Sequence, residues 1–219
     1  MQAKSRSKPE MARNLLSYIL TVVWTNTLTW LDVRLCLSSV LALWQEFLQH
    51  PISVGAVLPS SPWLAQAIAA AVPLDSQALI VEIGAGTGAV TRALLARGIA
   101  PSRLLVVERS AKLCKLLRHR FPYLVVVHGD AAELTRWVGP QDTVCAIVSS
   151  LPLRSLPDAT VTVIAAQMHE LLATDGMLVQ FTYGWVGASP LQTLGFERYK
   201  ASWEWRNIPP ARIDVLCKA

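Results

Sequence analysis

The sequence has few charged residues, few glycines and few cysteines, and each shortage excludes a class of protein. Charged residues make up 16% of the 219 residues and hydrophobic residues 53%, so the chain can bury enough apolar surface to fold and is not mainly disordered. Only 11 glycines exclude a collagen-like fibre, and only 4 cysteines exclude a small disulfide scaffold. The length fits one domain with a short extension.

The cysteines lie far apart in the sequence, and no pair has the CxxC spacing of a zinc site. They are Cys36, Cys114, Cys145 and Cys217. Cys114 and Cys145 fall within apolar segments, where a free cysteine usually behaves as a small buried hydrophobe. We therefore expect reduced thiols, a cytoplasmic protein and no metal ion.

No hydrophobic run reaches the roughly 20 residues that a membrane-spanning helix needs. Residues 15–24 form a mainly apolar run behind four basic residues, and residues 35–48 form a second one. Trp24, Trp30 and Trp44 fall in this region, and tryptophan rings favour the headgroup boundary of a membrane. We predict a basic arm and amphipathic interface helices over residues 1–50, ahead of a domain over 51–219. The alternative is a helix pair that packs on that domain.

The net charge of +5 favours an anionic partner, either nucleic acid or an anionic membrane surface. A basic surface without a partner is the plain alternative. The charge alone does not separate these readings.

Beyond Pro73, short apolar strands alternate with helical segments, which is typical of a parallel sheet covered on both faces. Ahead of it, Ser61 and Pro62 predict the start of a helix over 63–72. Ser110 is the predicted N-cap of another helix, which has its leucines on one face. The predicted strands are 78–82, 104–108, 123–128, 144–149 and 177–183, with further helices at 90–96 and 158–172 and a closing antiparallel pair at 203–208 and 212–216.

Three acidic or glycine-rich segments follow successive strands of this pattern. Glu82 precedes the glycines Gly84, Gly86 and Gly88, whose GxGxG spacing differs from the GxGxxG of dinucleotide-binding proteins and from the phosphate-binding P-loop. Glu108 ends the next strand, where a carboxylate can accept two ribose hydroxyls. Asp130 follows the third strand and could accept a hydrogen bond from an adenine amino group. The carboxyl ends of parallel strands meet at one sheet edge, so the sequence predicts a nucleoside site there.

This set resembles the S-adenosylmethionine-dependent methyltransferase superfamily over residues 78–183. The resemblance implies a Rossmann-like class I fold, an α/β architecture with a mainly parallel seven-stranded sheet and helices on both faces. It implies S-adenosylmethionine as cofactor and S-adenosylhomocysteine as product. It also implies that the glycine loop holds the methionine part, that Glu108 holds the ribose and that Asp130 with Ala131 borders the adenine. The full set of cofactor-binding residues implied is Ser60, Glu82, Gly84, Gly86, Thr87, Gly88, Glu108, Arg109, Asp130, Ala131, Ser149 and Leu151.

The segment after the fourth strand, Ser149-Ser150-Leu151-Pro152-Leu153, bears on the methyl acceptor. Enzymes that methylate base amino groups often carry Asn-Leu-Pro-Tyr or Asn/Asp-Pro-Pro-Tyr here, and the aromatic ring stacks on the base. Stacking is worth about 1–3 kcal/mol per base, and Leu153 cannot supply it. We therefore expect no nucleic-acid partner.

Ser-Leu-Pro-Leu resembles the bacterial phospholipid N-methyltransferases, which are related to the ribosomal RNA dimethylases. Other matching segments are 55–61, 181–184 and 206–211, so the resemblance covers nearly the whole chain past residue 45. It implies successive methylation of phosphatidylethanolamine toward phosphatidylcholine by an enzyme bound peripherally to the inner face of the membrane. Its partners would be a lipid substrate in the bilayer and an anionic membrane surface.

Ornithine lipid N-methylation is the alternative with the same motifs. Ribosomal RNA adenine methylation and a non-enzymatic membrane-binding module are further alternatives.

Within this resemblance, Ser150 and Tyr183 are the catalytic candidates, and Tyr183 and Arg206 are candidates for binding the lipid headgroup. The Tyr183 hydroxyl could bind a phosphate or an amine, and the guanidinium of Arg206 matches phosphate oxygens. The plain alternatives are core packing for Tyr183 and a surface ion pair for Arg206. No dedicated base is required, since a less polar pocket lowers the pKa of the acceptor amine.

Overall fold

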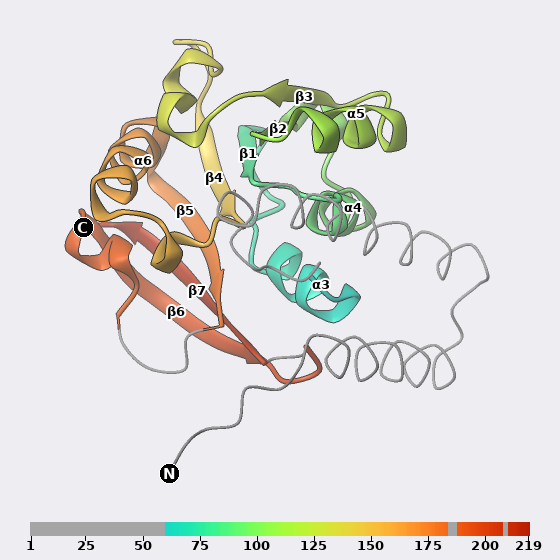
Figure 1. Ribbon diagram of the computed structural model, residues 1–219. Coiled ribbons are helices and arrows are strands. Elements are labelled where there is room, and N and C mark those ends of the chain that lie inside the picture. The colour runs from blue at the N-terminus through green and yellow to red at the C-terminus, as the bar shows by residue number, and fades with distance from the viewer. Residues whose placement is uncertain (1–59, 184–187, 208–209) are drawn as a thin grey trace, which may run out of the picture. The chain divides into compact units, whose positions relative to one another are not determined.

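Strands and helices alternate along the chain as the sequence pattern predicted (Figure 1). The structure is a computed structural model that describes residues 60–183, 188–207 and 210–219. The strands are β1 (Leu79–Ile83), β2 (Leu104–Glu108), β3 (Val125–His128), β4 (Val144–Ser149), β5 (Leu172–Thr182), β6 (Phe196–Glu204) and β7 (Ala211–Lys218). The α-helices are α3 (Pro62–Ala70), α4 (Ala89–Ala96), α5 (Ala111–Arg120) and α6 (Asp158–Leu171), and the short 3-10 turns are η1 (Pro101–Arg103), η2 (Ala131–Arg136), η3 (Leu153–Ser155) and η4 (Pro190–Thr193).

The strands form one seven-stranded sheet in the order β3-β2-β1-β4-β5-β7-β6. The first five strands run parallel, whereas β7 pairs antiparallel with β5 and β6 pairs antiparallel with β7. The predicted mainly parallel seven-stranded sheet is therefore confirmed. Because β1 lies between β2 and β4, the connections leave it in opposite directions, and ligands of α/β sheets bind at such a switch point.

Two apolar cores cover the two faces of the sheet. On one face, Leu64 and Ile68 of α3 pack with residues of α4, α5 and the strands, including Leu117 and Phe121. On the other face, α6 and the turns η2 and η4 cover the strands, with Met168 fully buried. The sheet thereby lies between two helical layers, and the loops that carry the polar residues follow the carboxyl ends of its strands.

Hydroxyl side chains start two of the helices where the sequence predicted them. Oγ of Ser61 accepts a hydrogen bond from the Leu64 N–H at 3.2 Å, and Oγ of Ser110 accepts one from the Leu113 N–H at 3.4 Å. Each satisfies one of the N–H groups that a helix leaves unpaired at its start. Cys114 is buried, as expected of a small hydrophobe.

The closing antiparallel pair is present, but its predicted boundaries were wrong. β6 begins at Phe196 and ends at Glu204, whereas the prediction placed it at 203–208. Most side chains of β6 are exposed, because β6 is the outer edge of the sheet, so the apolar pattern used for prediction is weak there. β5 also begins earlier than predicted, at Leu172. The predicted N-terminal helices and the boundary at residue 50 lie outside the described residues and stay predictions.

Candidate active site

The loop after β1 has a positive φ angle at three positions, a backbone conformation that favours glycine. Gly84, Gly86 and Gly88 have φ angles of +70°, +58° and +83°. A Cβ at Gly84 would lie 2.9 Å from Leu151 Cδ2, and one at Gly88 would lie 2.6 Å from a Phe121 ring carbon. A Cβ at Gly86 would meet no atom of the described residues within 4 Å. No part of residues 60–183, 188–207 or 210–219 therefore packs against the middle glycine, whereas the outer two are packed against neighbouring elements.

Glu108 links the first two loops. One of its carboxylate oxygens accepts a hydrogen bond from the Gly86 N–H and the other from the Ser110 N–H, each at 2.9 Å. The residue is only 7% exposed. Each carboxylate oxygen has a second lone pair, so each can also accept a hydrogen bond from a hydroxyl group of a ligand.

Glu82 is fully buried behind the glycine loop, and its carboxylate has no hydrogen bond with a described residue. Burial raises the pKa of Glu82 from 4.5 to about 7, and the nearby negative charge of Glu108 raises it further. The Thr91 hydroxyl and backbone N–H face the carboxylate and oppose the rise. A buried acid without a partner suits a ligand that brings a cation or an N–H donor.

Asp130 continues the row of acids from the third strand. One of its oxygens accepts a hydrogen bond from the Ala132 N–H at 3.0 Å, and the other lies 3.5 Å from Arg109 Nε. The Gly129 N–H donates to the Glu108 carbonyl, which joins this loop to the preceding one. Three consecutive loops are thus brought together at one edge, as the sequence predicted.

Arg120, at the end of α5, supports the glycine loop from outside. Its guanidinium donates a 2.7 Å hydrogen bond to the backbone carbonyl of Thr87. Burial lowers the pKa of Arg120, with nearby Arg92 adding to the effect. This contact fixes the last turn of the loop against the helix that follows β2.

The loop after β4 lies beside the glycine loop. The Ser150 N–H donates to the Ile83 carbonyl, and Ser149 Oγ accepts from the Leu151 N–H at 3.4 Å. Leu153 is only 4% exposed and packs into the core beneath α6. A buried leucine occupies the place where base-methylating enzymes present a stacking ring.

A pocket of about 260 Å³ opens beside this loop, and the described residues that line it come from β5, β7 and the segments after β4 and β5. Tyr183 lies in its wall, with its ring 5.6 Å from that of Phe181 in an edge-on arrangement. Burial raises the pKa of Tyr183, and the Asn207 side chain beside it opposes the rise. Tyr183 therefore stays protonated near neutral pH and can donate or accept a hydrogen bond, but it is no ready base.

The remaining predicted residues are Arg206 and Ser60. Arg206 makes a two-pronged ion pair with Glu204, with Nε–Oε1 at 2.9 Å and a second contact at 3.2 Å, which a lipid phosphate would have to share. Its guanidinium also lies 5.9 Å from the Trp63 ring centroid. Ser60 precedes Ser61, whose N–H donates to the Asn207 side chain, so Ser60 lies on the Tyr183 side of the site.

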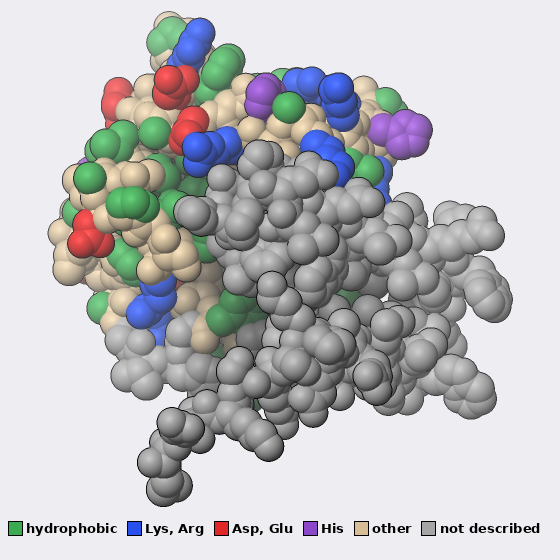
Figure 2. All heavy atoms as spheres, viewed as in Figure 1, with side chains coloured by type: hydrophobic (Ala, Val, Ile, Leu, Met, Phe, Trp, Pro, Cys, Tyr) green, Lys and Arg blue, Asp and Glu red, His purple; other side chains and the backbone are tan. Residues whose placement is uncertain are grey.

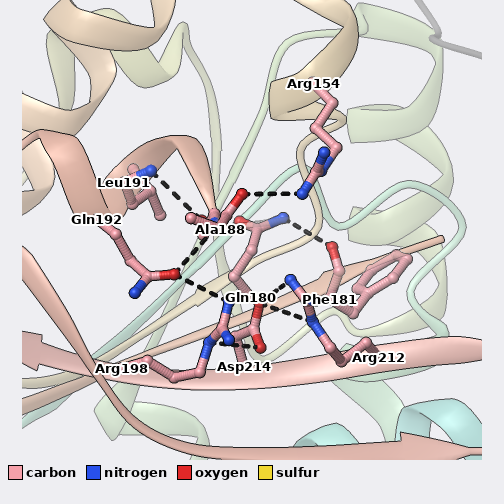
Figure 3. Close-up of polar contacts among 10 residues, drawn as sticks. Arg154, Gln180, Phe181, Ala188, Leu191, Gln192, Arg198, Arg212 and Asp214 are labelled. Carbon is pink, nitrogen blue, oxygen red and sulfur yellow. Dashed lines mark hydrogen bonds and ion pairs between the residues drawn. The ribbon is translucent and has the colours of Figure 1, made fainter. Parts of the chain in front are cut away.

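Sequence reasoning missed a polar group in the pocket wall. Asp214 of β7 is fully buried and is held by Arg212 and Arg198 at 2.9 and 3.1 Å (Figure 3). Gln180 of β5 is 5% exposed and lies between Ser149 and Asp214 in strand register. The signal was present in the sequence as a glutamine and an aspartate within otherwise apolar strands.

The residues present fit S-adenosylmethionine. Gly86 offers space where a side chain would intrude, Glu108 offers two acceptor oxygens for the ribose, and the unpaired Glu82 suits the ammonium of the methionine part. When bound, the sulfonium group supplies an electrophilic methyl. The chain itself contributes alignment and exclusion of water. The described part of the chain contains no group of three side chains able to hold a metal ion.

Comparison with known proteins agrees with this geometry. A family pattern described as a methyltransferase domain matches residues 80–176. The chain is 31% identical over 172 residues to the ornithine lipid N-methyltransferase of Singulisphaera acidiphila, with 76% of this chain and 89% of that protein covered. It is 42% identical over 79 residues to the probable ribosomal RNA small subunit methyltransferase A of Haloquadratum walsbyi, but this covers 33% of the chain and 24% of that protein.

Among solved structures, the fold resembles the N-methyltransferase NodS of Bradyrhizobium japonicum, determined with S-adenosyl-L-homocysteine. The TM-score is 0.54 at 16% identity, and the match covers 71% of this chain and 83% of that one. The chain belongs to the S-adenosylmethionine-dependent methyltransferase family, among the N-methyltransferases that the Singulisphaera protein represents. The predicted class I fold and cofactor are confirmed.

Proposed function

We propose that this enzyme transfers methyl groups from S-adenosylmethionine to the terminal amine of a membrane lipid. The observation that carries the proposal is the pocket beside the loop after β4. This loop adjoins the glycine loop, and the pocket is lined by apolar residues together with oxygen-bearing side chains such as Ser150 and Gln180. The oxygen atoms of such side chains can accept hydrogen bonds from the N–H groups of an amine. The buried Leu153 leaves a nucleobase without the usual stacking ring, which disfavours ribosomal RNA.

The acceptor lipid has two candidates. Phosphatidylethanolamine is the substrate that the sequence motifs suggest, with phosphatidylcholine as the end product. Ornithine lipid is supported at least as well, because the relative matched over 89% of its length is named for it. Both lipids present a primary amine near an anionic group, so the same pocket chemistry suits both.

For methyl transfer the protein mainly has to position the acceptor amine and favour its neutral form. The acceptor amine must lose a proton before it attacks, and a partly apolar pocket lowers the amine pKa by disfavouring the charged form. Ser150 and Tyr183 line the pocket, and the buried Tyr183 hydroxyl has no hydrogen-bond partner among the described residues, so each side chain is a candidate for holding the headgroup by a hydrogen bond. Methyl transfer then follows from in-line alignment.

We further propose that the enzyme works at an anionic membrane surface. Basic side chains gather on α5 and beside β3 on the face shown in Figure 2, and the last turn of α5 holds Arg118, His119 and Arg120. Arg118 and Arg120 also donate to backbone carbonyls, so part of this charge supports the fold. No helix in the described ranges is long and apolar enough to cross a bilayer.

The deciding experiment supplies radiolabelled S-adenosylmethionine and liposomes that contain phosphatidylethanolamine, ornithine lipid, both lipids or neither. We expect label in a lipid amine, and the mixed liposomes rank the two acceptors. Label in added ribosomal RNA alone, or in no acceptor, would refute the proposal. A chain that lacks residues 1–30 should sediment less with anionic liposomes while still binding S-adenosylhomocysteine.

A further inference from the structure

Gln180 is held in one orientation in the wall of the pocket. Its Nε2 donates to the Leu151 carbonyl at 3.0 Å and to the Phe181 carbonyl at 2.9 Å. Both partners can only accept, so exchanging the amide nitrogen and oxygen would place acceptor against acceptor. The nitrogen is therefore assigned without ambiguity, and the oxygen points away from both carbonyls.

The amide oxygen of Gln180 is buried and receives no hydrogen bond from any described residue. The arginines nearby are engaged: Arg212 and Arg198 hold Asp214, and Arg154 donates to the Ala188 carbonyl (Figure 3). Figure 3 shows the Gln180 side chain between these two groups of contacts. Buried polar atoms rarely remain unpaired in folded proteins, so this oxygen is suited to a donor from a ligand in the pocket that Gln180 lines.

The position of Gln180 relates it to the methylation site. In strand register it lies beside Ser149, the last residue of β4, and its Nε2 holds the Leu151 carbonyl of the loop that follows. In base-methylating enzymes an amide or carboxylate on that loop accepts a hydrogen bond from the amino group to be methylated. Here the loop has Ser150 at that position, and the neighbouring strand supplies an amide.

We propose that Oε1 of Gln180 accepts an N–H of the substrate amine and so turns the nitrogen lone pair toward the methyl donor. This inference rests on the proposed function, because it assigns the residue that binds the amine of that substrate. An N–H bonded to a fixed acceptor leaves the lone pair little freedom, which is how a positioned hydrogen bond accelerates a displacement.

The proposal predicts which methylations Gln180 assists. In each transfer the nitrogen forms a bond to the methyl carbon, and the S–C bond breaks with its electrons on sulfur. After the first two transfers the product ammonium releases a proton to solvent, whereas the quaternary product of the third has no proton to release. A neutral primary amine has two N–H groups, the monomethyl amine has one, and the dimethyl amine has none. Gln180 therefore assists the first two transfers and not the third.

The test compares three acceptors in one enzyme preparation. The substrates are phosphatidylethanolamine and its monomethyl and dimethyl derivatives in detergent micelles, with the matching ornithine lipid series beside them. Gln180→Met is similar in size but accepts no such hydrogen bond, and it also loses the Nε2 bonds to the Leu151 and Phe181 carbonyls, which affects all three amines alike. We therefore expect kcat/KM to fall at least tenfold further for the first two amines than for the dimethyl amine. The ratio of rates within one preparation does not depend on how much protein folds.

Two variants separate this role from a structural one. Gln167→Met makes the same change on α6, where the glutamine accepts from Thr135, and it should leave the ratio between acceptors unchanged. Gln180→Glu keeps an acceptor oxygen but, like Gln180→Met, loses the Nε2 donor to the Leu151 and Phe181 carbonyls. Its total activity should therefore fall, while the wild-type order of substrates is kept. An equal fall for all three amines in Gln180→Met, or no fall, would overturn the inference. Absence of lipid methylation by the wild type would instead refute the proposed function.

Discussion

Replacement of Glu82 by glutamine tests the electrostatics of the cofactor site. The pKa of this buried carboxyl is about 7, against an ordinary value of 4.5. At about 1.4 kcal/mol per pKa unit, ionisation of Glu82 in the ligand-free fold costs about 3 kcal/mol. Below the unfolded-state pKa the acid is protonated in both states and costs nothing. The penalty grows as the pH rises and is complete above about 7.

The variant Glu82→Gln removes this ionisation and should therefore gain stability relative to wild type as the pH rises. We expect an advantage of about 1 kcal/mol at pH 5.5 and about 3 kcal/mol at pH 8.5. Urea unfolding of the ligand-free proteins at the two pH values measures how the stability difference between variant and wild type changes with pH. Any effect of the substitution that does not depend on pH cancels in this comparison. Equal pH dependence of the two proteins would refute the assignment of a buried, unpaired carboxyl.

Burial in the ligand-free protein favours the protonated form of Glu82, whereas cofactor binding should favour the ionised form. The ammonium of S-adenosylmethionine favours the ionised carboxylate, so binding at pH 6.5 should release up to one proton, and wild-type affinity should weaken as the pH falls below about 7. Calorimetric titration in two buffers of different ionisation enthalpy measures this release. The glutamine variant should bind more weakly and release no proton, and proton release by the variant would point to another group.

Two further predictions concern the glycine loop. Gly86→Ala and Gly98→Ala should each lose about 1–2 kcal/mol of stability, because both glycines have positive φ and no described atom within 4 Å of an added Cβ. Only Gly86→Ala should also lose affinity for S-adenosylhomocysteine in calorimetric titration. Gly88→Ala should lose about 1–3 kcal/mol more in urea unfolding, since its Cβ meets an aromatic ring, and equal losses at all three positions would contradict the packing described. Arg120→Gln removes the charged donor to the Thr87 carbonyl and should weaken S-adenosylhomocysteine binding about tenfold. Unchanged affinity in that variant would mean that the loop holds its shape without the arginine.

The sequence was sufficient to predict the parallel core and the edge at which three polar loops meet, because the signals of both are local. Buried strands such as β4 are continuously apolar, and its predicted range matches the structure. Glu108 was recognisable because it directly ends a strand, although its bonds to Gly86 and Ser110 were not. Helix starts were also local, since Ser61 and Ser110 bond to groups three residues ahead.

The pocket wall could not be predicted, because it depends on pairing between distant segments. Gln180 meets Asp214 only through the β5–β7 register, and Leu151 only through the path of the loop after β4. The edge strand β6 was misplaced for a related reason. Among the described strands it pairs with β7 alone, and most of its side chains are exposed, so its sequence shows little apolar pattern.

The exposed outer strand β6 also affects how the molecule behaves at high concentration. A bare strand edge can pair with the edge of another molecule and seed aggregates. β6 carries Glu197, Arg198 and Lys200 along its length, and its register with β7 shifts between Arg198 and Lys200. Charges and an irregular register are features by which natural sheets discourage such pairing. The fold therefore ends its sheet in a strand that resists extension, which helps an enzyme of such apolar composition to stay dispersed.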